Sequence, residues 1–141
     1  MAFDNIDEEI VETLRTDASI TYRDLSQQLS VSLGTLTKRI KRLRKQGVIV
    51  KDTILVDWDK LGYSLEVLVA INIAHGNFAK VTEKIIQDEH VSHIYNTTGN
   101  WDGMAVCRFK EKRELNSFLK RLQENPDVKE TNTQLIIHTI R

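Results

Sequence analysis

Six basic side chains fall within eight consecutive residues of this sequence. They are Lys38, Arg39, Lys41, Arg42, Arg44 and Lys45. No acidic residue occurs between Asp24 and Asp52, so the segment lacks the i,i+4 ion pairs that usually neutralise a charged helix face. Such a face is either merely solvated or a binding surface for an anion. We favour the second interpretation, with the phosphates of double-stranded DNA as the expected anion.

The basic segment stands out because the whole chain is neutral, with 20 basic and 20 acidic residues. Residues 1–37 carry seven acids and two bases, a balance of −5, whereas residues 38–45 carry +6. Residues 51–141 carry 12 bases and 13 acids and are close to neutral. A charge concentrated in one place indicates a local partner rather than a general solubility effect.

Residues 5–50 are predicted to form three short helices that position these bases. Thr21 and Ser32 are suitable N-caps for the second and third helices, and Gly47 is suitable for ending the third. Leu36, Ile40 and Leu43 mark its buried stripe. Two short helices joined by a short turn, the second of them basic, are typical of a helix-turn-helix.

The outer face of the third helix carries the candidate DNA-binding residues. They are Gly34, Thr35, Lys38, Arg39, Lys41, Arg42 and Lys45. The first three are expected to face the groove, because the small side chains near the helix start allow a close approach. Lys41, Arg42 and Lys45 are expected mainly to contact phosphate, and Arg39 to bond either phosphate or the acids of the first helix.

The rest of the chain is predicted to form a second domain. Residues 48–57 have strand-like composition and are predicted to form a linker strand at the end of the first domain. The polar break at 57–62 places the boundary between domains 1–62 and 63–141. The pattern that follows is β-α-β-β-α-β, which is typical of a ferredoxin-like fold. Its predicted elements are a strand at 65–74, a helix at 78–89, strands at 91–98 and 104–109, a helix at 114–122 and a strand at 128–140.

Little in this second half suggests catalysis. Cys107 is the only cysteine, which excludes an internal disulfide and a cysteine metal cluster, and its place in a strand favours a core role. His90 and His93 have no obvious third ligand, and His75 and His138 are isolated. We therefore expect no enzyme, metal or cofactor. The acidic N-terminus and the lack of a long apolar run predict neither a signal peptide nor a membrane span, and favour the cytoplasm.

The segment from Gly99 to Gly103 is a second candidate site. Asn, Asp and Gly favour a simple hairpin turn, but Trp101 is unusual in such a turn. The Asp102 carboxylate is suited to holding an amino group, and the exposed backbone amides beside it are suited to holding a carboxylate group.

Five stretches together resemble the Lrp/AsnC (feast/famine) family of transcription regulators. They are IDEEIVETLRTDASITYRDLSQQLSVS, LTKRIKRLRKQGVI, LGYSL, TTGNWDGMAV and NPDVKETNTQLI, and they cover the chain nearly end to end. The resemblance implies an α+β protein, with a three-helix winged helix-turn-helix followed by a βαββαβ (RAM) domain. It also implies homodimers that assemble into tetramers, octamers or larger rings, with amino-acid effectors bound between dimers.

The resemblance further implies an effector site built from two segments. One is the turn of Gly99, Asn100, Trp101 and Asp102, and the other contains Thr131 and Thr133 of the last strand. Two residues depart from the family pattern. Leu33 stands where many members have Pro, and the bulky Trp101 is of a size to fill the cleft, which would make this member independent of effector.

The sequence thus predicts a sequence-specific, DNA-binding transcription regulator modulated by an amino-acid-like effector. One alternative is an effector-independent architectural protein that coats DNA. Another is an amino-acid sensor or small amino-acid-binding enzyme without DNA function.

Overall fold

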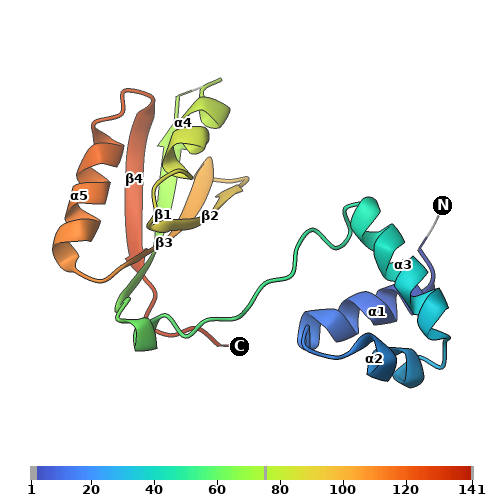
Figure 1. The fold of residues 1–141 in the computed structure, drawn as a ribbon. Coiled ribbons are helices and arrows are strands. Elements are labelled where there is room, and N and C mark those ends of the chain that lie inside the picture. The colour runs from blue at the N-terminus through green and yellow to red at the C-terminus, as the bar shows by residue number, and fades with distance from the viewer. Residues whose placement is uncertain (1–2, 75, 141) are drawn as a thin grey trace. The chain divides into compact units, whose positions relative to one another are not determined.

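The computed structural model describes residues 3–74 and 76–140, which form two compact units, up to Val56 and from Asp57 onward (Figure 1). The first unit is helical and the second is a sheet covered by helices. Asp57–Gly62, the polar break in the sequence, belongs to the second unit, where it contains a short 3₁₀ turn, η1 (Asp59–Leu61).

The first unit consists of α1 (Asn5–Thr16), α2 (Tyr22–Gln28) and α3 (Leu33–Lys45). The predicted caps are confirmed, since Thr21 Oγ1 accepts from the Asp24 N–H at 3.1 Å and Ser32 Oγ from the Thr35 N–H at 3.1 Å. Gly47 follows the end of α3 with φ +74°, the left-handed conformation that glycine adopts without steric cost. Local capping chemistry therefore sets where α3 begins and ends.

A small apolar core holds these three helices together. Its buried residues are Ile10, Leu25, Leu36, Ile40 and Leu43. The predicted stripe of α3 therefore faces inward, and this fixes which side of the helix is turned to solvent.

The prediction of a strand at 48–57 is wrong for this structure. No strand is assigned there, and Val50, Ile54 and Leu55 are 84%, 81% and 78% exposed. β-branched residues favour an extended backbone, but a strand also needs a neighbouring strand, and none of the four strands assigned in the described residues pairs with this segment.

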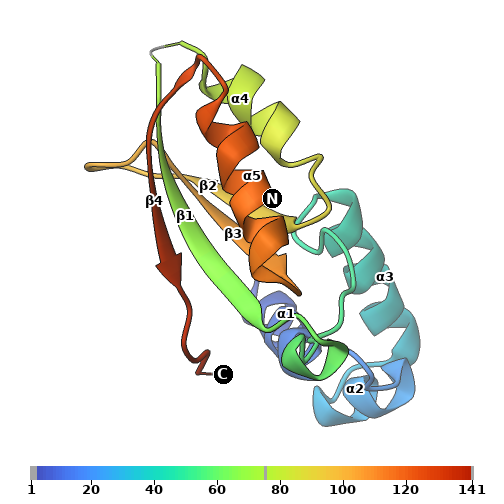
Figure 2. The ribbon, with the colours of Figure 1, turned by 90° about the vertical axis from the view of Figure 1, so that its left-hand side faces the viewer.

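The second unit has the predicted β-α-β-β-α-β order. Its elements are β1 (Leu65–Ile73), α4 (Phe78–Ile85), β2 (Val91–Asn96), β3 (Gly103–Phe109), α5 (Lys112–Gln123) and β4 (Val128–Leu135). The four strands form an antiparallel sheet of order β2-β3-β1-β4, and both helices lie against the same face of it (Figure 2). α4 and β4 end earlier than predicted, at Ile85 and Leu135.

The core of this unit lies between the sheet and the two helices. Cys107 is fully buried there, as predicted, next to Val67 in the β1–β3 register. Burial, with a smaller contribution from the charge of Asp88, raises the pKa of the Cys107 thiol to about 12. The thiol is therefore protonated at neutral pH and packs as a small apolar group.

Candidate nucleic-acid interface and effector turn

The six bases of α3 divide into two groups in the structure. All three arginines are paired with carboxylates, whereas Lys38, Lys41 and Lys45 are exposed and make no ion pair within the described part of the chain. This finding corrects the expectation that the positive charge of the segment is unrelieved. The acids come from outside the helix, from the start of α1 and from Asp52.

Asp7 is the centre of the larger ion-pair cluster. Its side chain is 1% exposed, and its Oδ1 accepts from Arg39 Nη1 at 2.9 Å. Its Oδ2 accepts from Arg42 Nη2 and, at 3.2 Å, from the backbone N–H of Asp4. A buried carboxylate is tolerated when hydrogen bonds and opposite charges satisfy it, as they do here.

Asp4 completes this cluster and caps α1. Its Oδ1 accepts from the Asp7 N–H at 3.0 Å, which together with the bond from the Asp4 N–H to Asp7 forms a capping box. Arg39 Nη1 lies 2.8 Å from both oxygens of Asp4. This hydrogen bond lowers the pKa of Asp4, and the bonds to Asp4 and then Asp7 raise the pKa of Arg39.

The third arginine is held on the opposite flank of the helix. Arg44 Nη2 lies 3.0 and 2.9 Å from the two oxygens of Asp52, and this hydrogen bond, followed by one to Tyr22, raises the pKa of Arg44. The second alternative predicted for Arg39, a bond to the acids of the first helix, is confirmed by its contact with Asp7. The sequence did not reveal the pairing of Arg42 with Asp7, of Arg39 with Asp4 or of Arg44 with Asp52. Asp4 and Asp7 lie 32 to 35 positions from their arginine partners, beyond the reach of helical spacing rules.

Gly34 and Thr35 occupy the first turn of α3 and are exposed, as required for a surface that approaches a groove. The Thr35 hydroxyl lies 2.8 Å from Ser32 Oγ, so it is oriented by the cap residue. With the three lysines, these residues form one continuous outer face, which we name the lysine face of α3: Gly34, Thr35, Lys38, Lys41 and Lys45.

The turn between β2 and β3 contains the effector candidates. The Asp102 N–H donates to the Ile71 carbonyl at 3.1 Å, and Asp102 Oδ2 accepts from the Ile73 N–H at 2.8 Å. The carboxylate thus fastens the turn to the end of β1, a structural role that the sequence did not reveal. Asp102 is nevertheless exposed, so the carboxylate is within reach of a ligand.

The other residues of the turn are held by the conformation of the backbone and by a hydrogen bond to it. Gly99 has φ +105°, which favours glycine, and Asn100 beside it is exposed. Trp101 is half-buried, and its carbonyl accepts from the Thr97 hydroxyl at 2.7 Å. The turn is therefore ordered by its own hydrogen bonds.

Thr131 and Thr133 are not joined to this turn by any hydrogen bond that the described residues make. Ile71 pairs with Thr131 on one side and with Gly103 on the other, so β1 separates the two segments. Thr133 pairs with Val69, further from the turn. Within one chain the two halves of the predicted effector site remain apart.

His90 and His93 are each engaged by neighbouring side chains. His90 stacks on Phe109 and bonds Asp88 Oδ1 at 2.8 Å, while His93 stacks on Tyr95. Residues 3–74 and 76–140 contain no group of three or more His, Cys, Asp or Glu arranged to hold a metal ion. His75 lies outside the described residues. Across those same ranges, no helix is long and apolar enough to cross a membrane.

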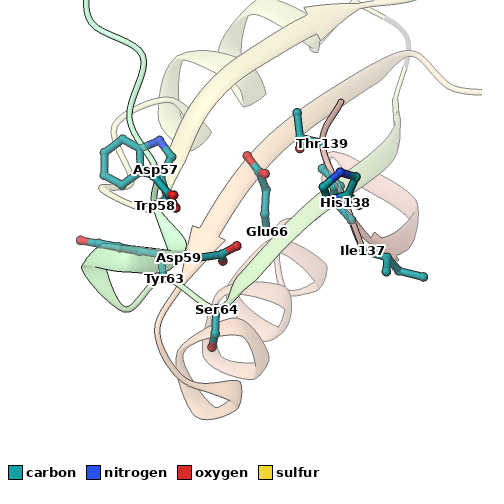
Figure 3. Close-up of a pocket in the computed structure, with 10 residues that line it drawn as sticks. Asp57, Trp58, Asp59, Tyr63, Ser64, Glu66, Ile137, His138 and Thr139 are labelled. Atoms are coloured by element: carbon teal, nitrogen blue, oxygen red, sulfur yellow. The ribbon is translucent and has the colours of Figure 1, made fainter. Parts of the chain in front are cut away.

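A cavity of about 320 Å³ in the second unit was not predicted from the sequence. Figure 3 shows Glu66 between the rings of Trp58 and Tyr63 on one side and His138 on the other. Glu66 pairs with Arg108 at 2.7 Å, and Arg108 lies 5.0 Å over the Trp58 ring. The pairing neutralises Glu66. The sequence signal for the cavity is a pair of aromatic residues, Trp58 in the polar break and Tyr63 directly after it.

Comparisons with known proteins agree with these two units. Residues 3–50 match a family model for a winged helix-turn-helix DNA-binding domain, and residues 66–141 match one for the Lrp/AsnC ligand binding domain. The chain is 34% identical to the HTH-type transcriptional regulator FL11 of Pyrococcus abyssi, covering 99% of this chain and 92% of that protein. It is 28% identical to the regulatory protein AsnC of Haemophilus influenzae, covering 92% and 88%.

Solved structures show the same fold. LrpC of B. subtilis superposes with a TM-score of 0.86 at 23% identity, covering 100% of this chain and 99% of that one. A Neisseria meningitidis transcriptional regulator, solved as a complex with L-Met, gives a TM-score of 0.89 at 17% identity, covering 99% and 93%. The chain therefore belongs to the Lrp/AsnC family of transcription regulators, with a helix-turn-helix DNA-binding domain and a ligand-binding domain.

Proposed function

We propose that this chain acts in the cytoplasm as a homo-oligomeric, sequence-specific regulator that docks the lysine face of α3 on double-stranded DNA. The observation that carries the proposal is a set of three exposed lysines on the side of α3 opposite its buried stripe, which make no ion pair with any residue that the structure describes. Gly34, Thr35 and Lys38 would approach the bases in the groove. Lys41 and Lys45 would neutralise phosphates and supply much of the affinity.

Selection of bound sequences from a random pool of duplex DNA, with and without amino acids, tests this function. A regulator enriches one short, two-fold related motif, because a symmetric dimer presents two recognition helices to two half-sites. Enrichment of no motif, with retention of the whole pool, would identify an architectural DNA-coating protein. Retention of no DNA at moderate salt would identify an amino-acid sensor or enzyme.

We also propose that the Gly99–Asp102 turn binds the effector, with an amino acid as its chemical class. Asp102 Oδ1 makes no bond that the described residues record, which leaves an oxygen for an ammonium group. Backbone amides near Gly99 would take the carboxylate. Because β1 keeps Thr131 and Thr133 away from this turn in one chain, their hydroxyls would reach an effector from a neighbouring subunit.

Asp102→Asn is expected to weaken effector binding roughly 10- to 150-fold, the range for loss of a charged hydrogen bond. The amide keeps an oxygen that can accept from the Ile73 N–H, so the turn should stay folded, whereas Asp102→Ala removes that acceptor as well. Calorimetric titration of the native and variant proteins with the common amino acids measures the effect. Equal affinity in the two proteins would contradict the role of Asp102. Binding of no amino acid by the native protein would identify an effector-independent member, with Trp101 in the cleft.

The face of the sheet opposite α4 and α5 is the proposed site of dimer formation. Leu68, Met104 and Val106 lie on it and are half-exposed. We expect the full chain to be a dimer, tetramer or octamer at micromolar concentration, and Val106→Glu to shift it toward smaller species. Light scattering measures the mass directly, and a native monomer at that concentration would contradict the proposal.

A further inference from the structure

We infer that Asp7 is a positioning residue that keeps Arg39 and Arg42 off the DNA backbone, so that only the lysines of α3 dock on phosphate. The inference rests on the proposed function of α3 and refines it. It concerns how a helix with six bases avoids binding bulk DNA too tightly.

The ion-pair cluster around Asp7 has no net charge. Asp4 and Asp7 carry two negative charges, and Arg39 and Arg42 carry two positive charges, so the four side chains together are neutral. Arg44 is likewise neutralised by Asp52 at 2.9 Å. The positive charge that α3 presents to a partner is therefore that of Lys38, Lys41 and Lys45, half of what the sequence suggests.

The guanidinium groups of Arg39 and Arg42 are already occupied by carboxylates. Arg39 Nη1 is shared among Asp4 Oδ1, Asp4 Oδ2 and Asp7 Oδ1, all within 2.8 to 2.9 Å. Arg42 donates from Nη2 to Asp7, and its Nε is buried without a hydrogen-bond partner among the described residues. The side chains of Arg39 and Arg42 are only 21% and 33% exposed. A phosphate approaching either guanidinium would also meet the carboxylates that hold it.

An arginine freed from this cluster would be able to bind the DNA backbone. Guanidinium groups bind phosphate bidentately and without regard to base sequence. Each additional phosphate contact raises the affinity for specific and bulk DNA alike and steepens its salt dependence by about 0.9 in log–log slope. By holding two such groups against α1, Asp7 limits non-specific binding and leaves discrimination to the residues that face the groove.

The test is the slope of log affinity against log salt, measured per subunit on a selected site and on bulk duplex DNA with the full-length protein. Lys41→Ala should reduce the steepness of this slope by about 0.9, whereas Arg42→Ala should leave it unchanged. Arg42→Gln, which keeps an N–H donor for Asp7, should give the same result as Arg42→Ala and guards against a folding defect in the first variant.

Asp7→Asn should steepen the slope by about 0.9 to 1.8, as one or two arginines reach phosphate, and should raise the affinity for the selected site and for bulk DNA by the same factor. Glu8→Gln is the matched control, since it removes the same charge from an exposed position on α1 that makes no side-chain bond to α3 within the described residues. It should change neither quantity. A purely structural role for Asp7 would alter stability without steepening the slope.

Two results would overturn the inference: a slope for Arg42→Ala that flattens as much as that of Lys41→Ala, or Asp7→Asn behaving like Glu8→Gln. A slope near zero for the native protein is a separate outcome. It would overturn the proposed docking of α3 on DNA, and the inference with it.

Discussion

Replacing Lys38, Lys41 and Lys45 together by alanine is expected to lower the affinity for duplex DNA about 100-fold per subunit at 0.15 M salt. In the proposed docking, Lys41 and Lys45 make two phosphate contacts at about 0.9 each, which contribute about 1.8 to the salt slope and about 1.5 decades of affinity at this salt concentration. Loss of the base contact of Lys38, at about 1 kcal/mol, accounts for the rest. A dimer on two half-sites would lose about four decades. Alanine is the best helix former, so α3 itself should stay intact.

The measurement is a titration of fluorescent duplex DNA with the native and triple-variant proteins at several salt concentrations. A matched control replaces Lys84, Lys112 and Lys129, which are exposed in the second unit and carry the same total charge. The control should bind DNA within a few-fold of the native protein. Equal losses in the two triple variants would mean that total charge, rather than the lysine face of α3, determines the affinity.

Asp7→Ala is expected to lower the free energy of unfolding of the first unit by about 2–4 kcal/mol. The change removes the hydrogen bond to the Asp4 N–H in the capping box and leaves two arginines without their shared carboxylate. Arg39 and Arg42 are partly exposed and can recover hydration, so the loss should stay below that of a fully buried pair. For a unit of this size it corresponds to a fall of about 15–30 °C in Tm.

Two spectroscopic signals separate the units in this experiment. Trp58 and Trp101 both belong to the second unit, so tryptophan fluorescence follows that unit alone. Circular dichroism at 222 nm follows the helices, including all of those in the first unit. Asp7→Ala should move the circular dichroism transition and leave the fluorescence transition in place. Glu8→Ala, at an exposed position, should move neither by more than about 0.5 kcal/mol, and an Asp7→Ala protein as stable as the native one would contradict a stabilising role.

The features that could be predicted from the sequence are those with a local cause. The caps Thr21 and Ser32, the glycine after α3 and the apolar stripe of Leu36, Ile40 and Leu43 each depend on residues within one or two helical turns. The β-α-β-β-α-β order follows from alternation and helical periodicity in consecutive segments. These signals are sufficient to place the lysine face of α3 on the solvent side.

The features that could not be predicted depend on contacts between distant residues. A bond from Arg39 to the acids of the first helix is one of two predicted alternatives, but no spacing rule selects Asp7 or shows that Arg42 shares it, because the positions are 32 and 35 residues apart. In the sequence, Asp102 resembles a free carboxylate, because its hydrogen bond from the Ile73 N–H forms only once β1 and β3 are side by side. Residues 48–57 have strand-like composition, yet composition alone does not provide the partner that a strand requires.

Competition between a selected DNA site and bulk genomic DNA tests most directly whether the lysine face of α3 reads sequence. The quantity measured is the ratio of the two dissociation constants at one fixed salt concentration near 0.15 M. A sequence-specific regulator is expected to give a ratio of about 1,000 or more. A ratio near 1, with the same steep salt dependence on both DNAs, would contradict sequence-specific regulation and identify a protein that binds the phosphate backbone alone.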